Sequence, residues 1–247
     1  LQVVITVFMI LFGVNFNAYF FIITKKFAQA FKMEEVRYYF GIIGIAILII
    51  TCNIYHIFGN AAKAFQQAAF QVSSIITTTG YATTDFAKWP MFSKSILMML
   101  TVVGACASST GGGIKVSRLL VGIKCIKREI VQLAHPKSVG IIRIGGKKVG
   151  SDILRTIYIY FIAYVGILIV SVMLVSLDNF DFETTFSAVL TTLGNVGPGM
   201  AKVGPMGNFA DFSILSKLVL CFDMLAGRLE IFPFLVLFTA PAWRRKF

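Results

Sequence analysis

The chain has 247 residues, of which 57% are hydrophobic and only 14% are charged, with a formal net charge of +12. Soluble domains carry about 25% charged residues, so this composition excludes an ordinary soluble fold and indicates a protein of the lipid bilayer. The positive charge raises the question of a nucleic-acid partner. Most lysines and arginines lie in loops between apolar stretches, however, so we predict no nucleic-acid binding.

Five apolar stretches are long enough to cross a hydrocarbon core, which takes roughly 20 residues. They lie at residues 3–24, 38–58, 95–124, 153–177 and 213–239. Basic residues gather at 25–37, 115–155 and 244–246, and the positive-inside rule therefore places these loops and the C-terminus in the cytoplasm. The opposite side carries acidic residues that we expect to concentrate cations at a mouth, namely Asp85, Asp178, Asp181, Glu183 and Asp211.

Two units of the chain, residues 38–134 and 153–247, share one plan, which makes an internal repeat. Each begins with a spanning helix and continues with a helical segment of about 11–16 residues, which spans only ~16–24 Å of a ~30 Å core. Such a segment must re-enter the membrane, where the non-helical backbone after it is tolerated if protein buries it or water lines it. These pore helices are predicted at 61–76 and 182–192.

The predicted fold class is an all-α polytopic membrane protein, with tandem helix–pore helix–filter–helix repeats around a pore as in potassium channels. Residues 1–37 are interpreted as the inner helix of a preceding repeat followed by a cytoplasmic loop. Residues 135–152, with several glycines and basic residues, are interpreted as a cytoplasmic connector between the two repeats. Because the chain begins within a helix, we expect it to be the C-terminal part of a longer protein.

The turn after the first pore helix reads Thr77-Thr78-Thr79-Gly80-Tyr81 and is typical of a potassium selectivity filter. In such a filter the backbone carbonyls replace the water shell of a K⁺ ion. Gly80 can adopt backbone angles that are closed to residues with a Cβ. The threonine hydroxyls can add ligands at the inner end, and the ring of Tyr81 can wedge the turn against surrounding protein. The alternative is an ordinary polar loop between helices.

A second filter loop is predicted at residues 193–199, which read Leu-Gly-Asn-Val-Gly-Pro-Gly. Alone it resembles any glycine-rich turn, but it follows the second pore helix as the first filter loop, residues 77–81, follows the first. When Gly197 is set on Gly80, Asn195 and Val196 match Thr78 and Thr79. The carbonyls of these residues are therefore the predicted ion ligands of the second repeat, namely those of Asn195, Val196 and Gly197.

The third span is interrupted by a small polar patch, the glycine loop of residues 104–115. A Walker nucleotide loop needs glycine directly before lysine, and here Ile114 intervenes, so this motif is excluded. Three consecutive glycines should break a helix, so we predict a loop that lies under the filter and moves to open or block the pathway. The alternative is tight helix packing. The predicted gate residues are Gly104, Ser108, Ser109, Thr110, Gly111, Gly112, Gly113 and Lys115.

Arg228 lies within the last apolar stretch, where a charge costs at least ~2.5–3.5 kcal/mol on insertion scales. It should therefore face a cavity or a partner. One interpretation is a gate residue below the filter that contacts the glycine loop or sets a barrier for cations. The other is a structural ion pair with Asp223 or Glu230. Both can hold at once.

Together these motifs resemble the Trk/Ktr/HKT superfamily of potassium transporters, most closely its bacterial TrkH branch. The resemblance assigns residues 77–81 and 193–199 to the third- and fourth-repeat filters, and residues 104–115 to the intramembrane loop. It also covers Gly13-Val14-Asn15-Phe16 in the inner helix of the second repeat and Gly227-Arg228-Leu229-Glu230 in the final helix. The likeness extends over essentially the whole chain.

The resemblance implies potassium uptake through four tandem repeats in one chain of the bacterial inner membrane, as a symporter or in a channel-like way, with K⁺ as substrate and no other cofactor. It also implies a homodimer and a cytosolic nucleotide-binding regulatory ring, which we expect to dock near residues 136–148. This chain would hold the third and fourth repeats and the tail of the second.

Other functions are weighed against potassium uptake. A dimeric cation channel with two pore units per chain gives no reason for the glycine loop or for Arg228. A secondary transporter of organic solutes would need inverted repeats, whereas both units here start from the same side. A membrane enzyme would need clustered catalytic side chains, and the two histidines and scattered cysteines provide none, so we predict neither an enzyme nor a metal centre of His and Cys.

Overall fold

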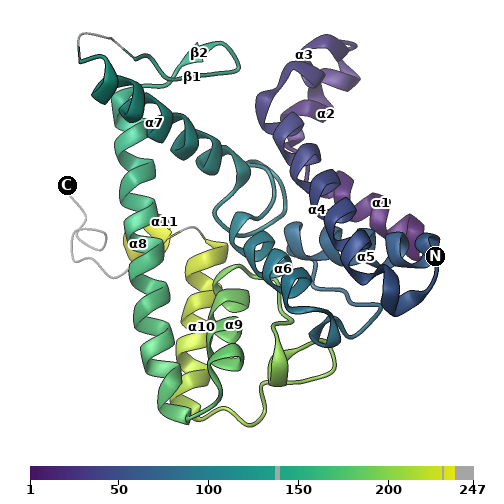
Figure 1. Cartoon of the computed structure of the whole chain (residues 1–247). Helices are drawn as coiled ribbons and strands as arrows, with labels where there is room; N and C mark the ends of the chain where they lie inside the picture. Colours follow the sequence, from purple (N-terminus) through teal and green to yellow (C-terminus); the bar gives the residue numbers. More distant parts are fainter. Residues whose placement is uncertain (137–139, 230, 237–247) are drawn as a thin grey trace.

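The computed structural model describes residues 1–136, 140–229 and 231–236. The long elements are helices, together with one small hairpin (Figure 1). The α-helices are α1 (Gln2–Phe12), α2 (Phe16–Ile23), α3 (Phe27–Lys32), α4 (Glu34–Phe58), α5 (Ala61–Ile76), α6 (Met91–Val103), α7 (Val116–Ala134), α8 (Ser151–Val175), α9 (Phe182–Leu193), α10 (Ile214–Arg228) and α11 (Ile231–Val236). Three single-turn 3₁₀ helices are η1 (Phe86–Lys88), η2 (Ser176–Asp178) and η3 (Ala201–Val203).

Within the described part of the chain, two helices are long and apolar enough to cross a membrane unbroken. They are α4, with 25 residues, and α8 continued by η2, with 28 residues. They match the predicted spans at 38–58 and 153–177. Helix α4 begins one turn earlier than predicted because Glu34 and Glu35 lie in its first turn, where acidic side chains favour the positive end of the helix dipole.

The other three predicted spans are broken. Residues 3–24 form α1 and α2, which pass together as apolar enough for a span but are bent by 94° at the break, a bend that the sequence analysis did not predict. Residues 95–124 divide into α6 and α7 around the glycine loop, as predicted. The last span divides into α10 and α11 between Arg228 and Ile231, which is a second departure, and its residues 237–239 lie outside the described part of the chain.

The break between α1 and α2 has a local cause. The side chain of Asn15 accepts a hydrogen bond from the Asn17 amide (2.9 Å) and so caps a new helix in a new direction. Gly13 precedes it at the end of α1, where an added Cβ would overlap the hydroxyl of Tyr39.

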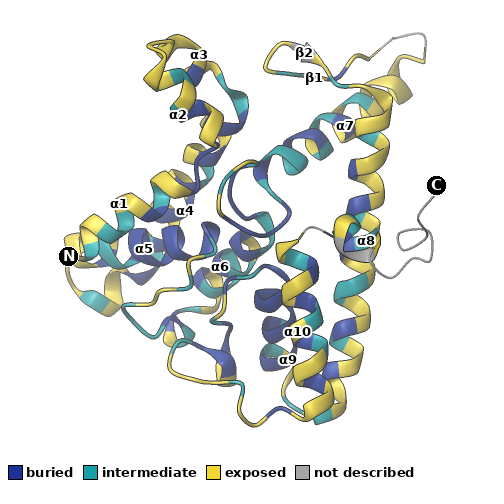
Figure 2. Cartoon of the chain, turned by 180° about the vertical axis from the view of Figure 1, so that it is seen from behind, coloured by how far each residue is buried: buried dark blue, intermediate teal, exposed yellow. Residues whose placement is uncertain are grey.

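The two repeats lie side by side, with α4, α5 and α6 in one and α8, α9 and α10 in the other (Figure 1). Burial colouring shows α5 and α9 enclosed, whereas α4 and α8 present exposed outer faces (Figure 2). Those exposed faces are apolar, for example Ile45 (62% exposed) on α4 and Ile162 (73% exposed) on α8. Apolar faces of this kind fit contact with lipid or with further protein.

The predicted connector contains the one departure from an all-α structure within the described residues. Strands β1 (Arg143–Ile144) and β2 (Lys147–Lys148) pair antiparallel, with Arg143 opposite Lys148. The ammonium group of Lys124 on α7 donates to the carbonyl of Arg143 (2.7 Å) and holds this hairpin against α7. The end of the molecule that carries the hairpin, uppermost in Figure 1, is called the hairpin face.

Both pore helices begin with a side-chain cap. Asn60 caps α5 by accepting from the Ala62 amide (2.9 Å), and Asp181 caps α9 by accepting from the Thr184 amide (3.0 Å). The cap satisfies an otherwise unpaired amide, and at α9 it also places an acid at the positive end of the helix dipole. Each pore helix is thereby fixed at the end away from its filter loop.

Replacing Asp181 by alanine should lower the free energy of unfolding by about 0.5–2 kcal/mol, since the cap is lost. Thermal unfolding of the purified full-length protein in detergent would measure this loss. Asp181→Asn keeps an acceptor and should unfold within a few tenths of a kcal/mol of the parent at neutral pH. If Asp181→Asn were as destabilised as Asp181→Ala, the capping explanation would be wrong.

The cap also predicts a dependence on pH. The hydrogen bond from the Thr184 hydroxyl holds the pKa of Asp181 below its ordinary value. Because the folded state has the lower pKa, this carboxylate stabilises the fold above about pH 4 and loses its contribution as the pH falls through the folded-state pKa.

Candidate functional site

The two predicted filter loops are held by the same backbone bonds. Each loop turns back on the last turn of its pore helix. Equivalent residues of the two loops differ by 117 in sequence number, as Gly80 and Gly197 do. The matching pairs are Thr78 N to Ile75 O (3.1 Å) with Asn195 N to Thr192 O (3.0 Å), and Thr79 N to Ser74 O (2.9 Å) with Val196 N to Thr191 O (2.9 Å). The predicted alignment of the two loops is therefore confirmed atom by atom.

The same correspondence holds for backbone angles and for side-chain bonds. Thr78 and Asn195 have φ of +55° and +57°, and Gly80 and Gly197 have +78° and +107°. In each loop, left-handed residues thus alternate with residues of negative φ, an alternation that turns successive peptide groups toward one side. A filter that coordinates a cation through carbonyl oxygens needs such an arrangement. The Ser74 hydroxyl bonds the Tyr81 carbonyl (2.5 Å) as the Thr191 hydroxyl bonds that of Pro198 (3.0 Å).

The two filter loops lie in direct contact. A Cβ on Gly80 would overlap the carbonyl oxygen of Val196 and lie 3.2 Å from the ring of Pro198. The corresponding space at Gly197 is open, with no heavy atom of the described residues within 4 Å. One side of the first loop is therefore closed by the second loop, and the matching side of the second loop is free.

The threonine hydroxyls of the first filter loop bind protein atoms. Thr77 donates to the carbonyl of Ser73 (2.6 Å) and contacts the hydroxyl of Thr79 (2.8 Å), and Thr78 accepts from the Gly112 amide (2.9 Å). The hydroxyls thus brace the loop. Tyr81 is 58% exposed among the described residues, so its predicted wedging against surrounding protein stays a prediction.

The glycine loop lies against both filter loops. The Gly112 amide reaches Thr78, and a Cβ on Gly112 would lie 2.6 Å from the carbonyl oxygen of Gly194. A Cβ on Gly111 would lie 3.3 Å from the carbonyl oxygen of Thr77. The absence of side chains on these glycines permits this close contact of the loop with both filter loops.

The remaining predicted gate residues shape the loop itself. Gly104 ends α6 and packs on Gly112 and Gly113, which closes the loop at its neck. Ser109 donates to the carbonyl of Cys106 (2.6 Å), and Ser108 has φ of +53°. Lys115, with φ of +77°, starts α7 as its N-cap residue.

The glycine loop is also bonded to the break between α1 and α2. The Cys106 amide donates to Gly13 O (3.1 Å), and the Phe16 amide donates to Ser108 O (3.1 Å). The Thr110 hydroxyl donates to Phe12 O at a longer 3.4 Å. The inner helix of the preceding repeat and the glycine loop are therefore joined along one seam.

Arg228 contacts the glycine loop. Its Nη1 donates to the carbonyl of Thr110 at 2.7 Å, from the last residue of α10. Asp223, the first alternative partner, accepts instead from the hydroxyl of Ser171 (2.7 Å). The second alternative partner, Glu230, lies outside the described residues. A Cβ on Gly227 would overlap the carbonyl oxygen of Leu193, so the end of α10 packs closely under the second filter loop.

Two buried polar residues meet in this region, of which the sequence analysis named Asn15 within a motif and missed Glu35. Glu35 is 8% exposed and Asn15 is 6% exposed, and they bond each other beside the glycine loop. Glu35 was assigned to a cytoplasmic loop because the apolar window started at residue 38. The sequence feature that could have indicated Glu35 is the pair of adjacent acids Glu34-Glu35 in an otherwise basic segment.

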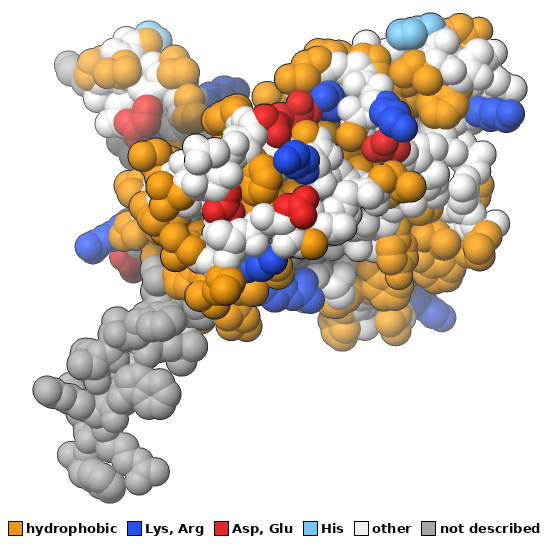
Figure 3. Space-filling model, turned by 90° about the horizontal axis from the view of Figure 1, so that it is seen from below, with side chains coloured by type: hydrophobic (Ala, Val, Ile, Leu, Met, Phe, Trp, Pro, Cys, Tyr) orange, Lys and Arg blue, Asp and Glu red, His pale blue; other side chains and the backbone are white. Residues whose placement is uncertain are grey.

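The predicted acidic residues at the other end of the molecule have structural partners. Asp85 caps η1, Asp178 accepts from the Ser213 amide (2.9 Å), and Glu183 pairs with Lys94 (2.6 Å). Figure 3, which views the molecule from that end, shows acidic and basic side chains interspersed. Lysines therefore accompany the acidic residues at this end, and the expected concentration of cations at a mouth stays a prediction.

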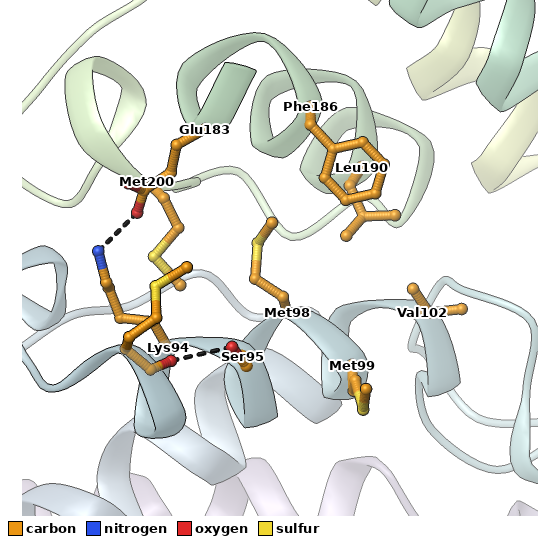
Figure 4. Close-up of a pocket in the computed structure, with 10 residues that line it drawn as sticks. Lys94, Ser95, Met98, Met99, Val102, Glu183, Phe186, Leu190 and Met200 are labelled. Atoms are coloured by element: carbon orange, nitrogen blue, oxygen red, sulfur yellow. Dashed lines mark hydrogen bonds and ion pairs between the residues drawn. The ribbon is translucent and has the colours of Figure 1, made fainter. Parts of the chain in front are cut away.

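A cavity of about 350 Å³ lies at the junction between α6 and α9 (Figure 4). Methionine and other apolar side chains line it, including Met98, Met200 and Phe186, with the Lys94–Glu183 pair at one side. A dehydrated potassium ion needs a cage of oxygen atoms. The chemistry of this cavity does not suit a cation path.

Comparison with known proteins places these features in a family. A family model described as TrkH, cation transport protein, matches residues 1–244. The chain is 34% identical over 247 residues to the Trk system potassium uptake protein TrkH of Salmonella typhimurium, covering 99% of this chain and 51% of that protein. It is 30% identical over 239 residues to TrkG of Escherichia coli, covering 96% of this chain and 49% of that protein.

The fold is similar to a solved structure as well. The crystal structure of the potassium transporter TrkH from Vibrio parahaemolyticus matches with a TM-score of 0.89 and 35% sequence identity, over 98% of this chain and 53% of that chain. The chain thus spans about half the length of the curated relatives that it matches.

Proposed function

Because this chain belongs to the TrkH family of cation transport proteins, we propose that it forms half of a pore that takes up potassium across a bacterial cytoplasmic membrane. The observation that carries the proposal is the atom-by-atom repetition of the backbone bonds in two adjacent loops, with a glycine loop packed against both. Carbonyl rings of this type select K⁺ by replacing its hydration shell. The family members named above are potassium uptake proteins.

The proposed ion ligands are the backbone carbonyls of both filter loops. They belong to Thr77, Thr78, Thr79, Gly80, Asn195, Val196 and Gly197. The C-terminal ends of α5 and α9 lead directly into these loops, and the negative end of each helix dipole favours a cation there. Inward flow gains ~2.3 kcal/mol per charge for each 100 mV of membrane potential. No chemical step is involved, so the proposed activity is transport without catalysis, with K⁺ as cargo.

The proposed gate is the glycine loop together with Arg228. In the structure the loop lies against the carbonyls of Thr77 and Gly194, at the inner end of both filter loops. Displacement of such a loop would open the path on the timescale of other functional loop motions. Arg228, bonded to Thr110, would hold the loop in place and add a positive charge near the ion path.

The remaining features of the proposal concern the complete protein. Residues 1–37 would belong to the second repeat, 38–134 to the third and 153–247 to the fourth, with 135–152 as the connector. The hairpin face would be cytoplasmic, as would the C-terminus, and a nucleotide-binding regulatory ring would dock there. Each subunit of a homodimer would carry its own pore. The open space beside Gly197 supports a further filter strand at that position.

The test uses a bacterium that lacks its potassium uptake systems. The full-length gene should restore growth on sub-millimolar potassium and rubidium uptake, whereas the 247-residue piece expressed alone should not. A full-length protein that reaches the membrane but restores neither would refute the potassium proposal. Rescue by the piece alone would instead favour the alternative of a dimeric channel with two pore units per chain.

A secondary transporter of organic solutes is the other alternative. Such transporters commonly use inverted repeats with substrate at the midplane. The two repeats here have the same order and the same bonds in the same direction, which disfavours that class.

A further inference from the structure

Glu35, in the first turn of α4, uses both carboxylate oxygens at the seam beside the glycine loop. Its Oε1 accepts from the amide of Ala107 at 2.5 Å, and its Oε2 accepts from Nδ2 of Asn15 at 2.9 Å. The side chain is 8% exposed, and the ion pairs formed among the described residues do not include it. A buried carboxylate is costly unless hydrogen bonds compensate it, so these two donors hold it in place.

The two donors come from parts of the chain that are distant in sequence. Ala107 belongs to the glycine loop, and Asn15 lies at the break between α1 and α2, where its other amide atom caps α2. Backbone bonds from Cys106 to Gly13 and from Phe16 to Ser108 flank the Ala107 contact on either side. Glu35 therefore lies at the centre of the seam between the loop and the preceding inner helix.

We propose that Glu35 is a positioning residue that braces the glycine loop in its closed place under the filters, so that opening requires release of the Glu35–Ala107 bond. The proposal rests on the proposed gating role of this loop. Arg228 holds the loop from the α10 side through Thr110, and Glu35 holds it from the α4 side through Ala107. The loop is thus fixed at two points that belong to different repeats.

The same turn of α4 connects the brace to the hairpin face. Glu34 forms an ion pair with Lys124 of α7, and Lys124 also donates to the carbonyl of Arg143 in the hairpin (2.7 Å). Of two adjacent residues in one helical turn, Glu35 therefore contacts the glycine loop and Glu34 is linked to the hairpin through Lys124. A displacement of the hairpin and α7 would therefore move this turn of α4 and alter the Glu35–Ala107 bond.

The test exchanges the polarity of the Glu35–Asn15 contact in the full-length transporter. Glu35→Gln keeps one acceptor but replaces the other carboxylate oxygen by a donor, which then faces the Asn15 amide group. Asn15→Asp keeps the α2 cap through Oδ1 but sets a second carboxylate against Glu35. The double variant Glu35→Gln/Asn15→Asp restores the contact with reversed polarity. In it the introduced glutamine can donate to the introduced aspartate, while the glutamine oxygen accepts from Ala107.

The first readout is rubidium flux into proteoliposomes. Each single variant should raise flux about 10-fold, because without the Asn15 contact the side chain at position 35 is no longer held against Ala107, while the apparent KM for rubidium and the K⁺/Na⁺ preference stay unchanged. The double variant should return most of the way to the parent flux. Equal flux in all four proteins, or a double variant no closer to the parent than the singles, would overturn the brace.

The second readout does not depend on transport. Cys106, next to Ala107, is fully buried, and its rate of modification by a water-soluble thiol reagent reports whether the loop is in place. With the other cysteines replaced, the single variants should react about 10-fold faster than the parent, and the double variant at nearly the parent rate. Unchanged reactivity in folded single variants would overturn the proposal.

The two readouts also separate the brace from the proposed function. If the parent protein moves no rubidium, the potassium proposal fails, whereas the Cys106 reaction still tests the contact. If the parent moves rubidium and the variants match it, the brace alone fails. Should one single variant not fold, the other carries both measurements.

Discussion

Replacement of Gly80 by serine should reduce the K⁺/Na⁺ preference of the full-length transporter at least about 10-fold and strongly lower potassium uptake. Gly80 has φ of +78°, a conformation that costs other residues about 1–3 kcal/mol. Any Cβ at this position would also overlap the carbonyl oxygen of Val196 in the second filter loop. One substitution therefore disturbs both loops at once, and about 1.4 kcal/mol already corresponds to a tenfold change.

The measurement is rubidium uptake with sodium as competitor, in cells that lack other potassium uptake systems. Gly44→Ala is the matched control, since Gly44 lies within α4 with no heavy atom of the described residues within 4 Å of an added Cβ. That variant should keep the parent preference. If Gly80→Ser kept the parent preference as well, residues 77–81 would not form a selective filter.

Replacement of Arg228 by glutamine should raise potassium flux about 10-fold or more. The bond from Nη1 to the Thr110 carbonyl holds the glycine loop, and a hydrogen bond to a charged group contributes about 1.5–3 kcal/mol. Loss of the positive charge would also lower any electrostatic barrier to cations. Both consequences have the same sign.

Arg228→Lys separates the two contributions because it keeps the charge but loses the fixed fork of donors. Flux near the parent value would indicate that charge dominates, and flux near that of Arg228→Gln would indicate the bond to Thr110. Lys217→Gln removes a similar bond from the other end of α10, where Lys217 donates to the Ala210 carbonyl (2.7 Å), and should leave flux unchanged. A lower flux in Arg228→Gln would contradict a restraining role.

Some of the site could be predicted from short segments of sequence. Helix α5 has the predicted bounds 61–76, and α9 ends one residue later than predicted, at Leu193. The glycine loop was predicted because three consecutive glycines do not continue a helix. The alignment of Gly197 on Gly80 came from their positions after equivalent helices, and the paired backbone bonds confirm it.

The breaks that were not predicted lie within long apolar windows. Hydropathy over residues 3–24 and 213–239 gives one span each, because a single Gly13 or Arg228 changes the mean very little. The turn at Asn15 and the end of α10 at Arg228 depend on what each residue meets in the fold, namely Tyr39 and Glu35 at the first break and the loop carbonyl of Thr110 at the second.

The sequence by itself determined the class of protein, the repeated plan and the positions of the filter and glycine loops, since apolar length, helix length and glycine content are local properties. The tertiary structure decided which groups meet: Glu35 with Ala107 across 72 positions, and Arg228 with Thr110 across 118. A local sequence pattern does not reveal such pairs. They form only when the breaks between α1 and α2, between α6 and α7, and between α10 and α11 come together beside the filter loops. The candidate gate therefore depends on contacts that only the tertiary structure brings together.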